Sequence, residues 1–308
     1  YEINNETLIL TNGEIVYEKL KDYLNEGSNT VTASDNAGNT ANFTFNYDCT
    51  PAVRRATNIL KYGESNEQSE YYVKPGDKIY MNISFKEKLA HNPTFTLINN
   101  GKEYVMDQKL VTAREPNKDG NFDYTVIYEI PENTEFVDGE ITLKVSNLED
   151  VYGNKIADEN GPTNGHKVFF DRTPATVTLN GEKSLTIEAG SKYIDAGATV
   201  VDNIDGEIST NYKFTYANYY ADPNSDDVTE SRLIEIDTRK TGLYKIAYIY
   251  TDKAGNTKQA TRYLYIQDTT KPTIKVDGKD EEIEAGSQKV YEVPKATVED
   301  NAYVTHDY

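Results

Sequence analysis

The stretch that decides the fold is YIYTDKAGNTKQATRYLYIQDTTKPTI, which runs from Tyr248 to Ile274. Apolar and polar residues alternate on both sides of D-K-A-G-N, and such alternation is typical of β-strands with one buried face. Asp and Asn can hydrogen-bond to nearby backbone and Gly tolerates a positive φ, so D-K-A-G-N predicts the turn of a hairpin. Pro272 fixes φ and donates no backbone hydrogen bond. The D-T-T-K-P segment around it therefore predicts the end of one structural unit and the start of the next.

The same phrases recur along the chain. VTASDNAGNTANFTFNYDCTP covers residues 31–51, and looser copies, LEDVYGNKI and VFFDRTP, cover 148–156 and 168–174. The segments that begin at Asp171 and Asp268 share EAGS and an ATV followed one residue later by DN, and they begin 268 − 171 = 97 residues apart. This period is the length of an immunoglobulin-like (Ig-like) sandwich. A motif that recurs in this way indicates a building unit rather than one active site.

The repeats predict an all-β chain of tandem Ig-like β-sandwich domains. The predicted domains are 1–47, the back half of one; 48–170, a longer one; 171–267, a complete one; and 268–308, the front half of another. Half a sandwich cannot bury a core, so the sequence is expected to be a window on a longer polypeptide, or its ends pair with something else. The only helix-like pattern is EIVYEKLKDYLNEG at 14–27, which predicts one or two helical turns.

Composition narrows the possible partners. The net charge is -19 with a pI near 4.6, which argues against nucleic acid as a partner and offers carboxylates to hard cations. No stretch approaches the roughly 18 apolar residues of a membrane span, so no membrane insertion of this segment is expected. A single cysteine, Cys49, and the lack of Trp fit export by a route that avoids disulfides. Cys49 itself is interpreted as a linker residue without a role.

Residues 171–308 resemble the bacterial Ig-like repeats of Gram-positive surface proteins, of the domain of unknown function 5011 or Big_3 type. The phrases LTIEAGSKYIDAGATVVDNIDGEI, TGLYKIAYIYTDKAGNTKQATRYLYIQD and DTTKPTI carry this resemblance. Residues 1–47 are similar to modules found behind the catalytic domains of secreted hydrolases and subtilase-like proteases, and 48–170 resembles an Ig-like module more weakly. The resemblance implies an extracellular tandem array, secreted or attached to the cell wall, that serves as a stalk, spacer or adhesive surface.

No catalytic motif accompanies the repeats. The three histidines are His91, His166 and His306, and none belongs to an H-E-x-x-H or a nucleophile motif. The segment is therefore predicted not to be an enzyme. An alternative stays open, in which these are accessory domains of a secreted protease or glycoside hydrolase whose catalytic domain lies elsewhere.

Acidic residues of the complete domain predict a calcium site. The loops VVDNIDGEI (200–208) and TDKAGN (251–256) are expected at the same end of the sandwich, where the chain also enters. Calcium takes six to eight oxygen ligands. The predicted ligands at this junction are Asp171, Asp202, Asn203, Asp205, Asp252 and Asn256, with Asp268, Asp300 and Asn301 repeating the arrangement one domain later. The alternative is turn chemistry on a solvated acidic surface, and no other cofactor is expected.

A tyrosine-rich strand suggests a ligand surface. NYKFTYANYYADPNSDD places aromatic residues at alternate positions, and an exposed aromatic row could stack on sugar rings or grip a protein. The candidates for binding an extracellular glycan or a host or matrix protein are Tyr212, Tyr216, Tyr219 and Tyr220. The alternative is that one face of this strand packs in the core.

Overall fold

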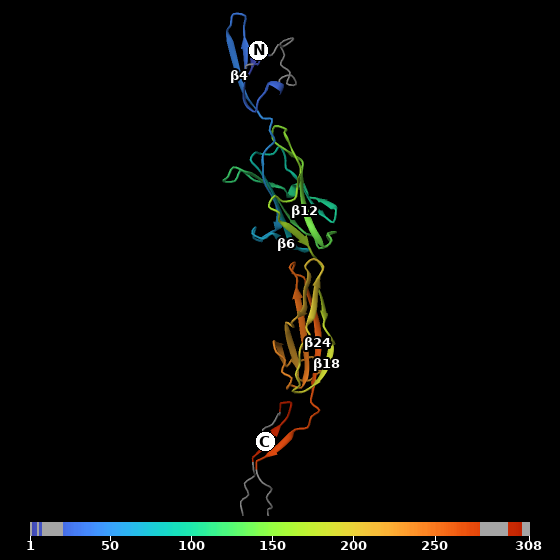
Figure 1. Cartoon of the computed structure of the whole chain (residues 1–308). Coiled ribbons are helices and arrows are strands. Elements are labelled where there is room, and N and C mark those ends of the chain that lie inside the picture. The colour runs from blue at the N-terminus through green and yellow to red at the C-terminus, as the bar shows by residue number, and fades with distance from the viewer. Residues whose placement is uncertain (1, 5, 8–20, 278–294, 304–308) are drawn as a thin grey trace, which may run out of the picture. The chain divides into compact units, whose positions relative to one another are not determined.

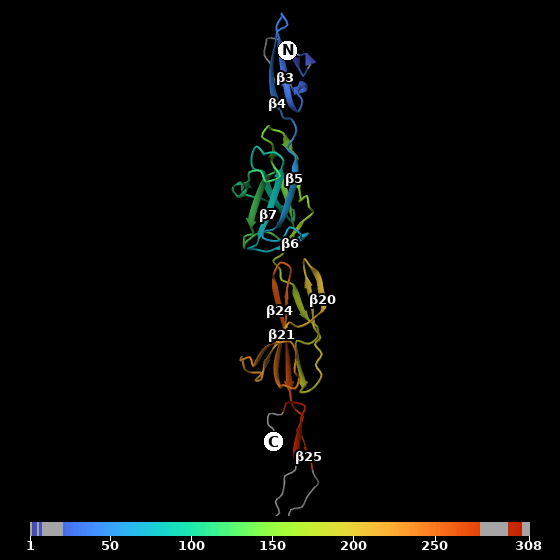
Figure 2. The same cartoon turned by 90° about the vertical axis from the view of Figure 1, so that its left-hand side faces the viewer.

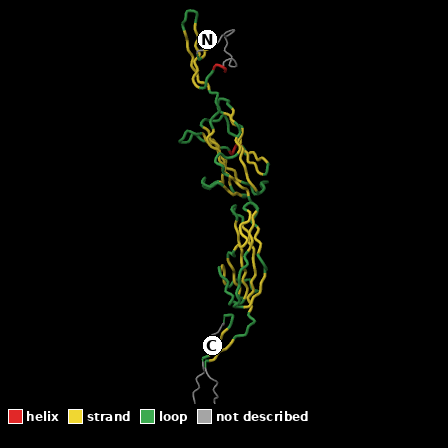
Figure 3. The backbone as a smooth tube through the Cα atoms, in the orientation of Figure 1, coloured by secondary structure: helices red, strands yellow, loops and turns green. Residues whose placement is uncertain are grey.

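Strands and turns make up nearly all of the part of the chain that the computed structural model describes, which is residues 2–4, 6–7, 21–277 and 295–303 (Figures 1 and 3). Within these residues the helices are two single turns, η1 (Lys21–Tyr23) and η2 (Gln108–Leu110). The all-β prediction is confirmed. Half of the predicted helical segment at 14–27, residues 14–20, lies outside the described residues, and η1 lies in the other half. No described helix has the length and apolar character needed to cross a membrane.

The chain divides into two compact units, Tyr1–Asp171 and Arg172–Tyr308. Every described strand pairs only with strands of its own predicted domain. The first domain forms an antiparallel sheet in the order β2-β1-β3-β4, whose strands are β1 (Glu2–Ile3), β2 (Glu6–Thr7), β3 (Gly27–Ser34) and β4 (Thr40–Tyr47).

The rest of the first unit is a sandwich of two sheets. One has the order β10-β11-β7-β5, with β5 (Arg54–Lys61), β7 (Lys78–Phe85), β10 (Thr112–Ala113) and β11 (Phe122–Glu129). The other has the order β6-β16-β12-β8-β9, with β15 also on β12; its strands are β6 (Glu70–Val73), β8 (Thr94–Asn99), β9 (Lys102–Val105), β12 (Gly139–Ser146), β15 (Glu159–Asn160) and β16 (Lys167–Phe170). A small hairpin joins β13 (Leu148–Glu149) to β14 (Lys155–Ile156).

Alternation along these strands builds the core of the first unit. On β7, Ile79, Met81, Ile83 and Phe85 are fully buried in one cluster with residues of the facing sheet such as Leu143. Because successive side chains of a strand point to opposite faces, the period-two pattern sends this set inward together. Each such side chain contributes about 1.5–3 kcal/mol on burial.

The second unit is also a two-sheet sandwich (Figure 2). One sheet has the order β17-β19-β20, with β17 (Thr176–Leu179), β19 (Ala198–Asp202) and β20 (Gly206–Tyr212). The other has the order β18-β24-β23-β21-β22, with β18 (Ser184–Glu188), β21 (Tyr216–Tyr220), β22 (Glu230–Leu233), β23 (Gly242–Thr251) and β24 (Thr257–Gln267). In both sandwiches one edge strand pairs in parallel, β6 with β16 and β18 with β24. A separate hairpin joins β25 (Thr273–Val276) to β26 (Ala296–Glu299).

One ion pair lies inside the core of the second unit. Arg262 on β24 is 1% exposed, and its Nη1 lies 2.6 Å from Asp195 Oδ1. The guanidinium also donates to the carbonyls of Glu182, Asn180 and Gly197. Because these partners satisfy its donors, Arg262 can remain charged inside the sandwich.

Candidate functional site

The three D-x-x-G-N turns close their hairpins with the same hydrogen bonds. In each, the Asp backbone N–H donates to the Asn carbonyl, at 2.9, 3.1 and 3.0 Å for Asp35, Asp150 and Asp252. The Asp Oδ1 accepts from the Asn backbone N–H at 2.8–2.9 Å, and the Asn Nδ2 donates to the Asp Oδ2. The Gly has a φ between +85° and +92°, which a residue with a Cβ rarely adopts. The turn therefore needs no ion to form.

The three turns differ in how deeply their Asp residue is buried. Asp35 is exposed, whereas Asp150 and Asp252 are buried and each lies beside other carboxylates. The motif thus supplies a local turn in every copy, and in two copies it also places a carboxylate in a buried acidic cluster.

We term Asp202, Asp205 and Asp252 the second-unit cluster because, after burial, the charges of all three raise the pKa of Tyr250. Asp202 ends β19 and Asp252 follows β23; both are buried, and their carboxylate oxygens lie within 4.8 Å of each other. Asp202 Oδ1 accepts the backbone N–H groups of Ile204 and Asp205 at 2.8 and 2.9 Å. These bonds fix the conformation of the loop after β19.

Several oxygens of this cluster lack hydrogen-bond partners. Asp202 Oδ2 and both carboxylate oxygens of Asp205 are buried without one, although Asp205 Oδ1 lies 2.9 Å from Lys253 Nζ in an ion pair. The Asp205 side chain is 2% exposed and that of Lys253 is 55% exposed. Burial, followed by the negative charges of Asp205, Asp202 and Asp252, raises the pKa of Tyr250. The three carboxylates therefore act on one small region.

The other residues predicted as calcium ligands are two asparagines, Asp171 and the three residues of the expected repeat. Asn203 is exposed, and Asn256 directs its Nδ2 to Asp252 Oδ2 at 3.0 Å. Asp171 is the last residue of the first unit, where its backbone N–H donates to the Val73 carbonyl at 2.9 Å. In the expected repeat of the site, Asp268 accepts from Thr270 and Asp300 from Ala302. Asn301 donates to Glu188.

A first-unit cluster was not predicted from the sequence. It consists of Asp48, Glu87 and Asp150, whose carboxylate oxygens lie within 4.8 Å of one another. The Asn154 amide lies among them and donates to Asp150 Oδ2 at 2.9 Å and to Asp48 Oδ1 at 3.3 Å. Burial, and then the charges of Asp48 and Asp150, raise the pKa of Glu87. Aligning DVYGN and DCTP with the later repeat would have identified Asp150 and Asp48.

Two D-x-T segments, which we term seams, are each held by a glutamate that the sequence analysis also missed. Glu188 at the end of β18 accepts the N–H groups of Thr269 and Thr270 at 2.8 and 3.1 Å, and both threonine hydroxyls at 2.9 Å. These bonds, led by that from the Thr269 backbone, lower the pKa of Glu188 to about 2. Asn301 also donates to the Ala189 carbonyl at 2.9 Å.

The seam after β4 has the same arrangement. Glu26 accepts the Cys49 backbone N–H at 2.8 Å and its thiol at 3.3 Å. The Cys49 thiol thus stands where the Thr269 hydroxyl stands in the later seam. The bond to Glu26 raises the pKa of Cys49, which keeps the thiol protonated as a donor. Cys49 was expected to have no role, and the structure shows it as part of this contact.

The predicted tyrosine row is not an exposed aromatic surface. Tyr219 and Tyr220 are 7% and 6% exposed, so a sugar could not stack on their rings. Tyr219 packs on Tyr244 with ring centroids 4.9 Å apart and donates to the Thr241 carbonyl. Tyr212 and Tyr216 are half-buried. The Tyr212 hydroxyl donates to the Ile249 carbonyl, and the Arg232 guanidinium lies over the Tyr216 ring. Tyr216, Tyr219 and Tyr220 lie on β21, whereas Tyr212 ends β20 in the other sheet.

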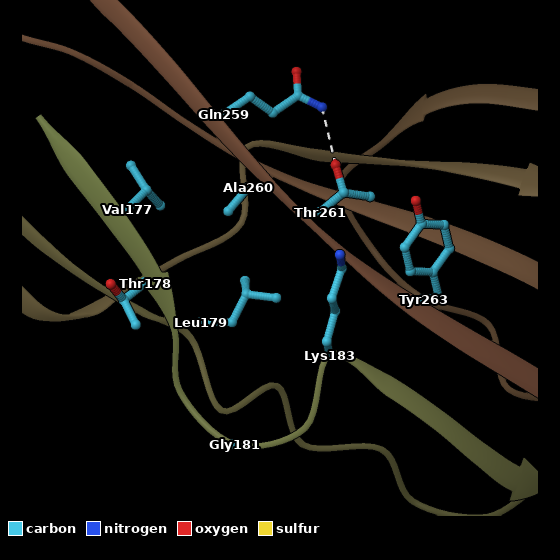
Figure 4. Close-up of a pocket in the computed structure, with 9 residues that line it drawn as sticks. All are labelled: Val177, Thr178, Leu179, Gly181, Lys183, Gln259, Ala260, Thr261 and Tyr263. Carbon is cyan, nitrogen blue, oxygen red and sulfur yellow. Dashed lines mark hydrogen bonds between the residues drawn. The ribbon is translucent and has the colours of Figure 1, made fainter. Parts of the chain in front are cut away.

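A groove of about 590 Å³ lies along β17 and β24 in the second unit (Figure 4). Lys183 is the one charged side chain that lines it, and Gln259 bonds to Thr261 at its rim. The other lining residues are Val177, Thr178, Leu179, Gly181, Ala260 and Tyr263. This lining holds no acid–base pair.

The described histidines have local polar partners. His91 lies 3.4 Å from the Asn147 side-chain amide, and His166 lies 2.9 Å from that of Asn164 and contacts the Tyr71 ring. His306 lies outside the described residues. Both described rings thus contact amide or aromatic side chains.

Residues 177–266 match the model of a family described as bacterial surface protein, Ig-like domain. A solved structure described as giving insight into host cell surface retention of a 1.5-MDa bacterial ice-binding adhesin is 15% identical, with a TM-score of 0.33 over 78% of this chain and 74% of that one. Cadherin domains 1–4 of protocadherin gamma B7 are 12% identical, with a TM-score of 0.27 over 95% and 71% of the two chains. No curated protein matches the chain.

Proposed function

We propose that this chain is a non-catalytic spacer segment of a bacterial cell-surface or secreted protein, because residues 177–266 match the model of a bacterial surface protein, Ig-like domain. In this proposal it works outside the cell as a stalk whose tandem domains resist bending where they join. Such a stalk needs domains that fold separately and seams that hold an angle. The hydrogen bonds at the Glu188 seam are the observation that carries the proposal.

Contacts at this seam come from residues on both sides of it. Before the seam, Glu188 and Ala189 offer acceptors; after it, Thr269, Thr270 and Asn301 donate to them. The contact at Gly190 is close, since a Cβ built there would lie 2.8 Å from the Asn301 carbonyl oxygen. Tyr303 adds a hydrogen bond to Asp237 at 2.8 Å. Several directional bonds restrict rotation more than a single proline linker does.

Distance distributions between two spin labels test the proposal. In a Cys49→Ser background, labels on Asp226→Cys and Val276→Cys report the angle across the Glu188 seam, because both positions are exposed. We expect a narrow distribution that broadens in Glu188→Ala and in Gly190→Ala.

Gly181→Ala is the matched control for Gly190→Ala. Its φ of +74° is close to the +71° of Gly190, but the nearest atom to its added Cβ is 3.8 Å away. It should add backbone strain and leave the distribution narrow. A broad distribution in the unaltered chain would contradict the spacer role, and specific retention of a glycan or matrix protein by this segment would favour an adhesive role instead.

A further inference from the structure

We propose that the second unit bears tension along the chain through the paired strands β18 and β24, and that Arg262 locks these strands against sliding. β18 follows the short crossing that leaves β17, and β24 is the last strand of the sandwich. Bearing tension goes beyond resistance to bending. It still rests on the proposed spacer role, since tension reaches this unit only if the chain joins other parts of a protein that is pulled.

The direction of pairing decides how tension acts on these strands. β18 and β24 pair in parallel over five residue pairs. The ladder continues at both ends, where the Tyr263 N–H donates to the Lys183 carbonyl at 2.9 Å and the Ala189 N–H to the Gln267 carbonyl at 2.8 Å. Because the strands run the same way, the start of β18 and the end of β24 lie at opposite ends of the ladder. Tension on these two points therefore slides one strand past the other.

Sliding is the direction in which such a ladder resists most. Successive residues of a strand are about 3.3 Å apart, and a hydrogen bond is lost when its donor and acceptor separate well beyond about 3.5 Å. A slide of one residue must therefore stretch every bond of the ladder together. Tension applied across one end of the same ladder would open the bonds one after another, with a single bond carrying the load at each step.

Arg262 ties β24 to the backbone that leads into β18. Its Nε donates at 3.1 Å to the Glu182 carbonyl, one residue before the ladder begins. Its Nη2 donates to the carbonyls of Asn180 and Gly197, and the ion pair with Asp195 holds the guanidinium in place. Hydrogen bonds from a charged donor are stronger than neutral ones, and the planar guanidinium can hold several acceptors at once. Sliding would have to break these bonds together with the ladder.

Burial protects this lock from solvent. Arg262 is 1% exposed, and the Asp195 side chain is 10% exposed. The hydroxyls of Tyr193 and Tyr248 also donate to Asp195 Oδ1, so the carboxylate is held from several sides. Ion pairs on the surface contribute little because water and salt screen them, whereas hydrogen bonds in a buried network are stronger. A buried lock therefore suits a strand pair under load.

The first unit has the same parallel pairing with a different residue at the position of the lock. β6 and β16 pair in parallel over four residue pairs. His166 stands one residue before the first paired residue of β16, as Arg262 does on β24. Its ring lies 2.9 Å from the Asn164 side-chain amide and contacts the Tyr71 ring. The first unit therefore provides an internal reference that substitutions of Arg262 do not touch.

Pulling the full chain with optical tweezers in two directions tests the sliding geometry. Pulling on the two ends of the chain loads β18 against β24 along their length. In a Cys49→Ser background, handles on Glu182→Cys and Lys258→Cys pull instead at one end of the pair, and both positions are exposed. We expect the second unit to unfold at a clearly lower force in this second direction. Equal forces in the two directions would overturn the proposal.

Arg262→Lys is the deciding variant for the lock. Lysine keeps a positive charge near Asp195 but has one nitrogen in place of three, so it cannot hold the same carbonyls. When the ends are pulled, we expect the unfolding rate of the second unit at a given force to rise by at least about tenfold, because bonds to a charged group are lost. The unfolding rate of the first unit should not change.

The length released identifies which unit unfolds. Residues 172–267 number 267 − 171 = 96, and residues 48–171 number 171 − 47 = 124. Full extension should therefore release roughly 330 Å and roughly 420 Å.

Tyr219→Phe is the matched control. It also removes a side-chain bond to a backbone carbonyl, that of Thr241, but from β21, which lies outside the loaded pair. It should lower the free energy of unfolding in denaturant and leave the rate under end-to-end tension nearly unchanged. Equal rate increases in Arg262→Lys and Tyr219→Phe would overturn the lock. Should Arg262→Lys not fold, Asp195→Asn keeps the acceptor oxygen without the charge and should give a smaller increase in the same rate; no increase would overturn the lock.

Failure of this inference is distinguishable from failure of the spacer role. Broad label distributions across the Glu188 seam would contradict the spacer role, whatever the unfolding forces are. Narrow distributions, together with forces that do not depend on the pulling direction, would contradict the load-bearing pair alone.

Discussion

The first-unit and second-unit clusters are built from the same turn but differ in what faces their carboxylates. In the first, the Asn154 amide lies between Asp150 and Asp48 and donates to both. In the second, Asn256 donates to Asp252, and the Asp202 and Asp205 oxygens include several without a hydrogen-bond partner. One repeat thus satisfies its carboxylates with its own amide. The other leaves Asp202 Oδ2 and the Asp205 carboxylate buried without a hydrogen-bond partner.

The pKa values of two carboxylates in the first-unit cluster shift in opposite directions. Although burial alone raises the pKa of Asp150, hydrogen bonds from Asn154, Tyr152 and Gly153 lower it below the ordinary value. Glu87 lacks such donors, and its pKa is raised. The first-unit cluster therefore combines a stabilised carboxylate with one that holds its proton more tightly.

Removing the Asn154 amide should have the largest effect. Asn154→Ala removes the amide donor shared by Asp150 Oδ2 and Asp48 Oδ1 and leaves only backbone donors to these two carboxylates, so we expect the free energy of unfolding of the first unit to fall by about 2–3 kcal/mol. Denaturant unfolding followed by hydrogen exchange in that unit measures it. Asn39→Ala, in the exposed turn at Asp35, is the matched control and should cost clearly less. Equal losses would mean that turn closure alone, and not the buried cluster, accounts for the contribution of Asn154.

Glu87→Gln should change stability in the opposite direction. Because the folded pKa of Glu87 is raised, the folded state binds its proton more readily, and stability from this group is present at low pH and lost as pH rises through the folded pKa. At neutral pH the variant should therefore stabilise the first unit by about 1 kcal/mol or less. Melting temperatures across pH should show this gain disappearing below the ordinary Glu pKa of about 4.3. A gain that persists there would contradict the electrostatic explanation.

The hydrogen bonds of the Glu188 seam should persist until the pH falls well below the ordinary pKa of glutamate. The pKa of Glu188 is about 2 against an ordinary 4.5, so its contribution is complete above the ordinary value and is lost as pH falls toward 2. The label distribution across this seam should therefore stay narrow at pH 4.5 and broaden near pH 2. Glu188→Gln should give a distribution that does not respond to pH in this range. Broadening of the unaltered chain already at pH 4.5 would count against the assigned role of Glu188.

Cys49→Thr should have the smallest effect. It gives the first seam the hydroxyl that Thr269 supplies in the later one, and a hydroxyl donates a stronger hydrogen bond than a thiol does. We expect slower hydrogen exchange at residues 49 and 50, with Cys49→Ala giving faster exchange. No difference between the two variants would show that the backbone N–H alone holds Glu26.

The sequence was sufficient for the strands and turns. Alternation in Gly242–Thr251 places Tyr244, Ile246, Tyr248 and Tyr250 on one face, and the first three are buried, although Leu243 and Ala247 on the other face are buried too. D-x-x-G-N predicts the hairpins. Both signals are local, since they depend on backbone geometry within a few residues. Asp202, Asp205 and Asp252 could be proposed because the ends of an Ig-like sandwich bring these loops together.

What the sequence could not show depends on contacts between distant residues. Glu188 meets Thr269 across 81 residues, and Glu26 meets Cys49 across 23. Nothing near Glu188 in the sequence distinguishes it from the other acidic residues. The chain has 51 Asp and Glu residues in all. The burial of the tyrosine row was equally hidden, because it depends on distant residues such as Tyr244, which packs on Tyr219, and Ile249, which accepts from Tyr212.

Hydrogen exchange of Asn154→Ala and Asn256→Ala, each against the unaltered chain, compares both clusters directly. The amide of Tyr152 reports on the first-unit cluster, and those of Ile204 and Asp205 report on the second. We predict that Asn154→Ala speeds exchange at Tyr152, because its amide joins Asp150 to Asp48, and that Asn256→Ala leaves Ile204 and Asp205 unchanged, because its amide donates to Asp252. Equal acceleration in both clusters, or none in either, would contradict the division between a cluster held by its own amide and one in which that amide does not bond to Asp202 or Asp205.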